Sequence, residues 1–272
     1  MASITDCVSE GLKYPFNDVK KILSFGMLFA IINVISFATS QIAVNAFRKV
    51  TIANGDSLAL KLSQIPANDI YLIVALSVIS FIITLFIMGY QYNVIKFSID
   101  KKNELPGFGD VLNIFANGIK YFIVSLAYNI IPIVLCVVGV ILINGSHGEY
   151  LIILAAILFI IFNFLLIMAM ANMIDADKFT KAFDLREVLD KIANLGWGKY
   201  IGIILFTFLI SAIVLISVSI ILMLLSGVVA MVINQAIVIS AIMTIIEGLL
   251  VSPYISLFFS RVYGSIYLEA NK

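Results

Sequence analysis

One carboxylate, that of Glu247, is the strongest candidate for chemistry in this chain of 272 residues. It is the only charged side chain between Tyr200 and Ser260, a stretch long enough to cross a membrane twice. An intramembrane carboxylate is costly unless it is protonated, paired or hydrated, so such groups commonly serve transport or proton transfer. Two interpretations of Glu247 stay open: a protonatable gate or cation site, and a protonated side chain that hydrogen-bonds a neighbouring helix.

Amides and prolines form the next group of candidates. An amide hydrogen bond between membrane helices contributes about 0.6 to 2 kcal/mol, and we interpret most of these amides as contacts between helices rather than a solute path. Pro132 and Pro253 each remove a backbone hydrogen bond and are predicted to kink their helices. The amides in or beside the apolar runs are Asn33, Asn129, Asn163, Asn172, Asn234 and Gln235.

Catalytic and metal-binding motifs are absent from the sequence. Phosphate-binding loops, dinucleotide-binding glycine patterns, HExxH, CxxC and nucleophile elbows do not occur. His147 has no Cys or acidic residues at zinc spacing, and Asn144 begins a glycosylation sequon. Four aspartates lie among Lys and Arg residues, which predicts a cross-paired, solvated surface and not a cation site: Asp175, Asp177, Asp184 and Asp190. We predict no enzyme activity, no cofactor, no metal and no nucleic-acid partner.

Long uncharged runs place these residues in a membrane. The sequence is 62% hydrophobic and 12% charged, about half the charged fraction of an average soluble protein, roughly 25%. A helical crossing needs ~20 apolar residues, and in lipid a helix satisfies its own backbone groups. Six membrane-spanning helices are predicted. Two lie between Tyr200 and Ser260, and the others lie in the runs Ile22 to Phe47, Ile70 to Ile95, Tyr121 to Ser146 and Tyr150 to Ile174.

The distribution of Lys and Arg predicts the orientation. All but three of the 17 basic residues precede the first span, follow the sixth, or lie between the second and third or the fourth and fifth. The exceptions are Arg48, Lys49 and Lys61. The positive-inside rule therefore places both termini in the cytoplasm. Cys7 and Cys136 then fall in different environments, and both are predicted to be free thiols.

A repeated motif precedes alternate spans. In its first two copies Phe stands two residues before Asp, Asp stands directly before Val, and Gly follows at the same spacing; the third copy repeats the theme with an insertion. Asp at this place is predicted to cap the helix that follows. We predict one membrane domain over residues 1–272, built of three repeat units at roughly 12–100, 101–178 and 179–272. The motif residues are Phe16 and Asp18, Phe108 and Asp110, and Phe183 and Asp184.

Each unit is predicted to begin with a short amphipathic helix on the cytoplasmic side. Such helices either lie in the membrane interface or dip into the bundle, and the interface is favoured because Arg186 and Lys191 are long enough to snorkel. Asp184 and Glu187 are predicted to form a capping box. The apolar residues that share one face ahead of the fifth span are Leu185, Val188, Leu189, Ile192 and Leu195.

Several short motifs resemble an archaeal family of membrane proteins. They are Tyr14-Pro15-Phe16-Asn17-Asp18, Met88-Gly89-Tyr90, Leu105-Pro106-Gly107-Phe108, Gly196-Trp197-Gly198-Lys199-Tyr200 and Arg261-Val262-Tyr263-Gly264. Over nearly its whole length the chain is similar to the family known as domain of unknown function 4013. The resemblance implies an archaeal cytoplasmic membrane protein. It brings no established activity and no catalytic residue.

The predicted fold is all-α, a polytopic membrane protein of six transmembrane helices arranged as three tandem hairpins, each preceded by a short cytoplasmic amphipathic helix. We predict a protein of the cell (plasma) membrane that binds membrane lipids or a membrane-protein partner, including a second copy of itself. A transporter of a hydrophobic or small neutral solute, with Glu247 as a protonatable group, is the alternative. It ranks second because the spans lack the convergent polar groups that bind ionic solutes.

Overall fold

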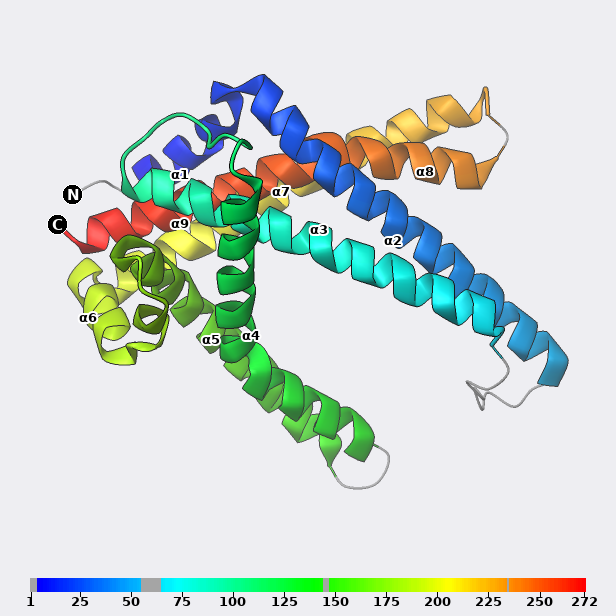
Figure 1. Ribbon diagram of the computed structural model, residues 1–272, viewed down its shortest axis with the longest axis horizontal. Helices are drawn as coiled ribbons and strands as arrows, with labels where there is room; N and C mark the ends of the chain where they lie inside the picture. The colour runs from blue at the N-terminus through cyan, green and yellow to red at the C-terminus, as the bar shows by residue number, and fades with distance from the viewer. Residues whose placement is uncertain (1–3, 55–64, 144–146, 234) are drawn as a thin grey trace. The chain divides into compact units, whose positions relative to one another are not determined.

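The computed structural model describes residues 4–54, 65–143, 147–233 and 235–272, which form helices and connecting turns without a strand (Figure 1). Six helical segments are long and apolar enough to cross a membrane, so the six predicted spans are confirmed as helices of membrane-crossing length. These segments are Val19–Ala46, Ala67–Ile99, Val111–Leu142, Gly148–Ala176, Trp197–Ala230 and Ala236–Ala270.

Short helices and turns accompany these spans. The α-helices in chain order are α1 (Ile4–Lys13), α2 (Val19–Asn54), α3 (Ala67–Ile99), α4 (Val111–Leu142), α5 (Gly148–Ala176), α6 (Leu185–Leu195), α7 (Trp197–Ala230), α8 (Ala236–Ile246) and α9 (Ser252–Ala270). The 3₁₀ turns are η1 (Tyr14–Asn17) and η3 (Phe179–Phe183). One π-helical turn, η4 (Glu247–Val251), joins α8 to α9.

The chain divides into two compact units. Unit 1 comprises Met1–Val19, Met88–Ala212 and Ser256–Lys272, and unit 2 comprises Lys20–Ile87 and Ile213–Ile255. Helices α3, α7 and α9 each run from one unit into the other. Unit 1 therefore holds α1, α6 and the end of α9 together with the span ends that the basic residues assign to the cytoplasm.

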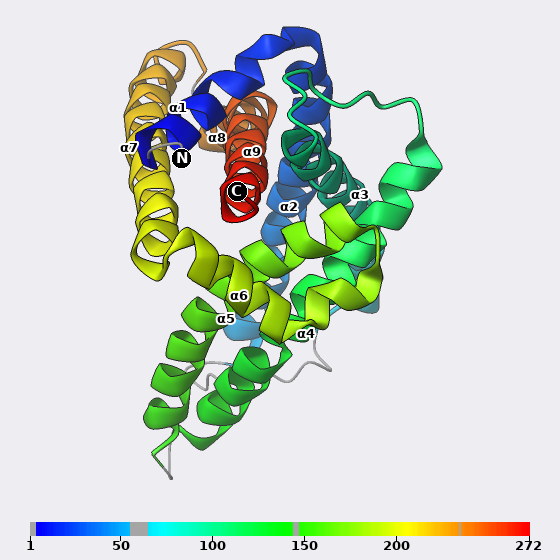
Figure 2. The same cartoon turned by 90° about the vertical axis from the view of Figure 1, so that its left-hand side faces the viewer.

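The core of unit 1 is built from helices that are distant in the sequence. Its largest members are fully buried, and the hydroxyl of Tyr200 on α7 donates a 2.5 Å hydrogen bond to the carbonyl oxygen of Phe164 on α5. Helices α1 and α6 cover the ends of the spans, and Figure 2 shows α1 beside α9. Seven helices contribute buried side chains to this core, for example Val8 (α1), Ile95 (α3), Val124 (α4), Met168 (α5), Ile192 (α6), Tyr200 (α7) and Phe258 (α9).

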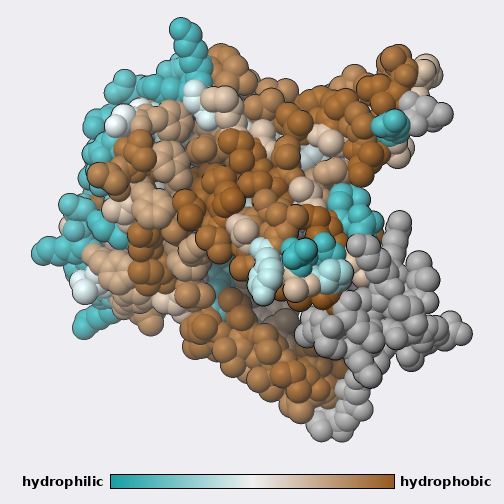
Figure 3. All heavy atoms as spheres, turned by 45° about the vertical axis from the view of Figure 1, so that its right-hand side comes forward, coloured by the Kyte–Doolittle hydropathy of each residue, from teal (hydrophilic) through white to brown (hydrophobic). Residues whose placement is uncertain are grey.

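Helices α4 and α5 form an antiparallel hairpin within unit 1. Near its tip the two backbones touch, because a Cβ on Gly139 would lie 2.8 Å from the carbonyl oxygen of Gly148. Most of the outer half of this hairpin exposes large apolar side chains, for example Ile141 and Ile157. Hydrophobic atoms cover most of the face seen in Figure 3, and most of its hydrophilic atoms lie along the left-hand edge of the view. This pattern is typical of helices surrounded by lipid.

Unit 2 contains most of α2 and α3, the second half of α7, and α8 with η4. Gly26 on α2 lies against the carbonyl oxygen of Leu249, and a Cβ on Gly248 would lie 2.5 Å from the Cα of Ala30. Asn33 on α2 also donates a 3.4 Å hydrogen bond to the carbonyl oxygen of Thr244. Helix α2 and the π turn therefore pack backbone against backbone at these glycines.

One prediction about the short helices was wrong. No helix precedes α4, because the segment from Asp100 to Asp110 contains Pro106, Gly107 and Gly109 and runs as turns and extended chain. In α6, which forms as a helix over Leu185–Leu195, Val188, Ile192 and Leu195 are buried, while Leu185 and Leu189 are exposed. The exposed pair leaves apolar surface on α6 beside its buried residues.

Candidate functional site

An apolar pocket opens along one side of α5 in unit 1. We call it the α5 pocket; its volume is about 300 Å³, at the lower end of the range of known ligand sites. At its outer end Phe159 and Phe208 are 51% and 52% exposed, so the pocket is open toward the surroundings of the spans. Its lining comes from four helices and comprises Tyr121, Phe159, Ile160, Asn163, Phe164, Leu166, Ile167, Met170, Ile204, Phe208 and Tyr263.

Three polar side chains line the α5 pocket. The amide group of Asn163 donates to Asn129 Oδ1 on α4 at 2.9 Å and to the carbonyl oxygen of Phe159 at 2.8 Å. The phenols of Tyr121 and Tyr263 complete the set, and neither hydroxyl hydrogen-bonds another group of the described chain. The pocket thus pairs a satisfied amide with two phenol hydroxyls that remain able to donate and accept.

A second apolar pocket adjoins the first between α4 and α5. This Pro132 pocket has a volume of about 480 Å³ and shares Phe159 and Ile160 with the α5 pocket. Pro132 lies inside α4 and has no backbone N–H to donate to the carbonyl oxygen of Tyr128. The kink at this residue stays a prediction. The remaining lining residues are Ile133, Cys136, Ile152, Ala155 and Ala156.

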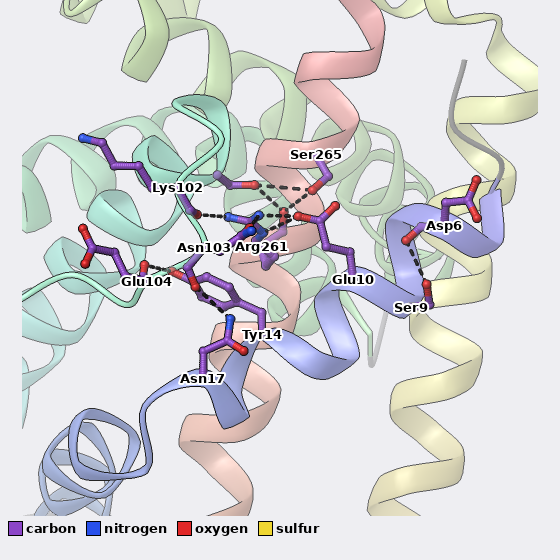
Figure 4. Close-up of polar contacts among 11 residues, drawn as sticks. Asp6, Ser9, Glu10, Tyr14, Asn17, Lys102, Asn103, Glu104, Arg261 and Ser265 are labelled. Atoms are coloured by element: carbon purple, nitrogen blue, oxygen red, sulfur yellow. Dashed lines mark hydrogen bonds and ion pairs between the residues drawn. The ribbon is translucent and has the colours of Figure 1, made fainter.

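A buried arginine organises the polar end of unit 1 (Figure 4). The side chain of Arg261 on α9 is 3% exposed. Its Nε donates to Glu10 Oε1 on α1 at 2.9 Å, its Nη1 donates to the carbonyl oxygen of Lys102 at 2.5 Å, and its Nη2 donates to Asn103 Oδ1 at 2.8 Å. The guanidinium also lies 4.7 Å from the ring centroid of Tyr14. Arg261 therefore joins α1, η1, the α3–α4 connection and α9.

Tyr14 ties the same cluster to the α3–α4 connection. Its hydroxyl donates to the carbonyl oxygen of Glu104 at 3.0 Å, and Asn17 donates to the carbonyl oxygen of Asn103 at 2.7 Å. Burial raises the pKa of the Tyr14 phenol well above its usual range, although the neighbouring Arg261 charge acts in the opposite direction. The phenol is thus a neutral hydrogen-bond donor, and the cluster is built to hold elements together.

A polar pocket of about 340 Å³ lies beside the Arg261 cluster. Its charged lining is balanced, and Glu269 is shared between Lys199, at 3.7 Å, and Lys272. Cys7 also lines it, and burial raises the pKa of the Cys7 thiol, with the Glu269 charge adding to the effect. A raised pKa makes a thiol unreactive. The charged residues of this pocket are Asp6, Glu10, Lys101, Arg261, Glu269 and Lys272.

The second and third copies of the repeat motif share a tyrosine contact. Phe108 stacks on Tyr90 with ring centroids 4.5 Å apart, and the Tyr90 hydroxyl donates to the carbonyl oxygen of Pro106. Phe183 stacks on Tyr128 at 6.3 Å, and that hydroxyl donates to the carbonyl oxygen just before Phe183. In both copies a tyrosine on the preceding part of the chain holds the motif. The sequence reasoning missed these tyrosines.

The motif aspartates behave as helix caps in two copies. Asp110 accepts a hydrogen bond from the Asn113 backbone N–H at 3.2 Å, and Asp184 accepts one from the Glu187 backbone N–H at 3.2 Å. Asp184 caps the short helix α6, whereas Asp110 caps the span α4 directly. Asp18 directly precedes α2 in extended conformation. Phe16 of the first copy is exposed.

Glu247 begins the π turn in unit 2 and is exposed. The Ser252 backbone N–H bonds the Glu247 carbonyl oxygen five residues back, and Pro253 follows at once as the second residue of α9. Because Pro253 has no N–H for Leu249, the π turn accommodates the proline. Neither the α5 pocket nor the Pro132 pocket, both in unit 1, includes Glu247.

Other predicted residues take structural roles. Lys181 pairs with Asp184 at 3.1 Å and Glu187 at 2.5 Å, and Asp175 accepts from the Tyr267 hydroxyl, as expected for a cross-paired surface. Among the described residues no group of three His, Cys, Asp or Glu is arranged to hold a metal ion. Asn234, the Asn144 sequon and the side chains of Arg48, Lys49 and Lys61 lie outside the described residues.

Comparison with known proteins gives one match. The model of a family described as "Protein of unknown function (DUF4013)" matches residues 72–224, more than half of the chain. The chain belongs to this family. The matched range of this DUF4013 protein includes all of α4, α5 and α6, and with them every lining residue of both apolar pockets except Tyr263. No curated protein and no solved structure matches the chain.

Proposed function

We propose that this DUF4013 protein is a non-enzymatic, membrane-embedded lipid-binding protein and that the α5 pocket holds the lipid. The observation that carries the proposal is the pocket's lining, which combines apolar side chains from α4, α5, α7 and α9 with three neutral polar groups. Ligand sites for apolar molecules have this composition. Lipid surrounds the spans at high concentration, so a ligand that is itself a lipid reaches the pocket by lateral diffusion.

The open end of the α5 pocket supports a ligand from the bilayer. Phe159, Ile160 and Phe208 are each about half exposed and stand on spans of membrane-crossing length. A polar solute would have to cross hydrocarbon to reach a pocket at this depth, and that transfer is costly. A lipid or another apolar molecule pays no such penalty.

The finer topology belongs to the same proposal. We place the protein in the cell (plasma) membrane of an archaeon, with both termini in the cytoplasm and three tandem hairpin repeats. Support comes from the distribution of Lys and Arg and from unit 1, which gathers α1, the start of α7 and the end of α9. Membrane lipids are its proposed partners, together with a membrane-protein partner or a second copy of the chain.

Lipid retention tests the proposal. The protein is purified in a mild detergent, and bound lipids are counted by native mass spectrometry. The substitution Ile160→Trp enlarges a side chain that lines the pocket, and we expect it to lower lipid occupancy several-fold. Ile157→Trp is the matched control, because Ile157 is similarly exposed on α5 but lines neither the α5 pocket nor the Pro132 pocket. Equal occupancy in both variants, or no retained lipid in the unchanged protein, would refute lipid binding at this site.

A second candidate function rests on Glu247. Its exposed carboxyl stands within the candidate span Ala236–Ala270 on a π turn, and such turns recur at functional sites. This arrangement favours a protonatable group in a transporter of a hydrophobic or small neutral solute. Glu247→Gln is then expected to fold normally and to abolish proton-coupled flux in vesicles. Flux that is unchanged in Glu247→Gln would remove this candidate.

A further inference from the structure

The polar groups of the α5 pocket mark one end of it as the place for a ligand's polar group. Tyr263 on α9 and Tyr121 on α4 both line this end of the pocket. Both phenols can donate to and accept from a ligand hydroxyl or carbonyl. Asn163 differs, because its N–H groups are already used by Asn129 and Phe159. A hydrocarbon chain can therefore pass Asn163 without stripping a hydrogen bond from its amide.

The two apolar pockets differ from the polar pocket in the charge of their lining residues. Within the described part of the chain, no Asp, Glu, Lys, Arg or His lines the α5 pocket or the Pro132 pocket, whereas six charged side chains line the pocket beside Arg261. A phosphate or carboxylate placed at Tyr121 and Tyr263 would lose its hydration without gaining a cation. A hydroxyl, ester or quinone carbonyl would instead exchange water for a phenol at little cost.

The combined length of the two pockets sets the length of the chain they accept. They meet at Phe159 and Ile160, and together they are lined by α5 from Ile152 to Met170. At ~1.5 Å per residue this part of α5 rises about 27 Å. The hydrocarbon core of a bilayer is ~30 Å thick, so one leaflet accounts for about 15 Å. Taken end to end, the two pockets are therefore longer than the apolar chain of a lipid confined to one leaflet.

We propose that the ligand is an uncharged amphiphile with one apolar chain longer than a leaflet, hydrogen-bonded through its polar end to Tyr121 and Tyr263. Its chain passes Asn163 and Phe159 along α5 and ends in the Pro132 pocket, beside Cys136 and Ile152. The inference rests on the proposed function and adds to it the neutral head, the single long chain and the direction in which that chain lies.

Photolabelling distinguishes this inference from lipid binding in general. The full-length protein is reconstituted in phosphatidylcholine vesicles with one of three probes that carry a diazirine at the chain end. The probes are an alcohol with a chain of leaflet length, an alcohol with a chain twice as long, and the phosphate monoester of the longer alcohol. After irradiation the labelled peptides are identified by mass spectrometry.

The longer alcohol is expected to label Ile133, Cys136 or Ile152, and the shorter one to label residues near Phe159. The phosphate monoester is expected to label at least ~10-fold less, which corresponds to about 1.4 kcal/mol. Replacing Tyr121 and Tyr263 together by Phe should reduce labelling by the longer alcohol several-fold. The control Tyr150→Phe, at an exposed tyrosine of α5 that lines neither pocket, should not change it.

Each contrary result has a distinct meaning. If no probe labels either pocket, the proposed function fails. If both alcohols label only residues of the α5 pocket, lipid binding stands and the long-chain inference is overturned. Equal labelling by the alcohol and its phosphate monoester, or labelling that is unchanged when both tyrosines are replaced, overturns the neutral head and its place at Tyr121 and Tyr263.

Discussion

Arg261 and Glu10, separated by 251 positions in the sequence, form an ion pair in which Nε and Nη2 of the guanidinium both donate to Glu10 Oε1. Arg261 is almost fully buried, whereas the side chain of Glu10 is 50% exposed. The pair fastens α1 to α9 within unit 1. Helix α1 also contributes Cys7 and Val8 to the core, so the pair and the core residues hold the same helix.

Removing the carboxylate of Glu10 should destabilise unit 1. Glu10→Gln leaves the buried Arg261 guanidinium without its counter-charge, and we expect a loss of about 1 to 3 kcal/mol, since partial exposure of Glu10 reduces the cost. Thermal unfolding in detergent measures the effect. The control Asp100→Asn breaks the exposed pair with Lys102, at 3.3 Å, and should cost less than about 1 kcal/mol. Equal losses in the two variants would contradict a clamping role for Arg261.

The helix crossing at Gly89 should tolerate no side chain. A Cβ on Gly89 of α3 would overlap the carbonyl oxygen of Ile114 on α4, so Gly89→Ala forces the helices apart at a cost of about 1 to 3 kcal/mol. Gly227→Ala on α7 is the matched control, because nothing lies within 4 Å of its added Cβ. That variant should be neutral or stabilised by up to about 1 kcal/mol. The stabilities of the two variants are compared from their unfolding curves in the same detergent. Equal stability of Gly89→Ala and Gly227→Ala would contradict a close helix crossing at Gly89.

The cap of α6 should weaken in acid. The Glu187 backbone N–H and then the Lys181 ammonium lower the pKa of Asp184 below the ordinary value of 3.8. A carboxyl with a lowered pKa in the folded state stabilises the fold above its unfolded pKa, and this stability disappears as the pH falls through the folded pKa. Protease resistance of α6 should therefore decrease below about pH 4. Asp184→Asn should flatten this decrease, and the exposed Asp190→Asn should keep it. The same acid profile in Asp184→Asn as in the unchanged protein would refute the assignment.

The amide pair in the α4–α5 hairpin should be energetically coupled. Asn163→Leu and Asn129→Leu each leave one amide without its partner, whereas the double variant removes both. A double-mutant cycle on thermal stability should give a coupling energy of about 0.6 to 2 kcal/mol. A coupling energy near zero would show that the bond at 2.9 Å contributes nothing to the hairpin.

Local patterns predicted the helices and their caps well. Span positions follow from the uncharged runs, because a helix in lipid must be both apolar and long. The caps at Asp110 and Asp184 depend on residues only three positions apart, which sequence spacing shows directly. The helix predicted before α4 was wrong because Pro106, Gly107 and Gly109 outweigh the analogy with the other repeat units.

Contacts between distant residues were beyond sequence reasoning. The sequence placed Arg261 among the basic residues after the last span and in a family motif, but nothing local to it indicates Glu10 or Tyr14 as partners. The α5 pocket likewise depends on how α4, α5, α7 and α9 pack; Asn163 was interpreted as a contact between helices, and most of the other lining residues are ordinary apolar span residues. The π turn at Glu247 had one usable signal, the proline six positions later.

An experimental map of the protein in lipid nanodiscs tests lipid binding in the α5 pocket most directly. The account predicts elongated density beside Asn163 and Phe159 that belongs to no side chain, with one end at Tyr121 and Tyr263. Helices α5 and α7 closed against each other, with Phe159 and Phe208 filling the space between them and no such density, would contradict it.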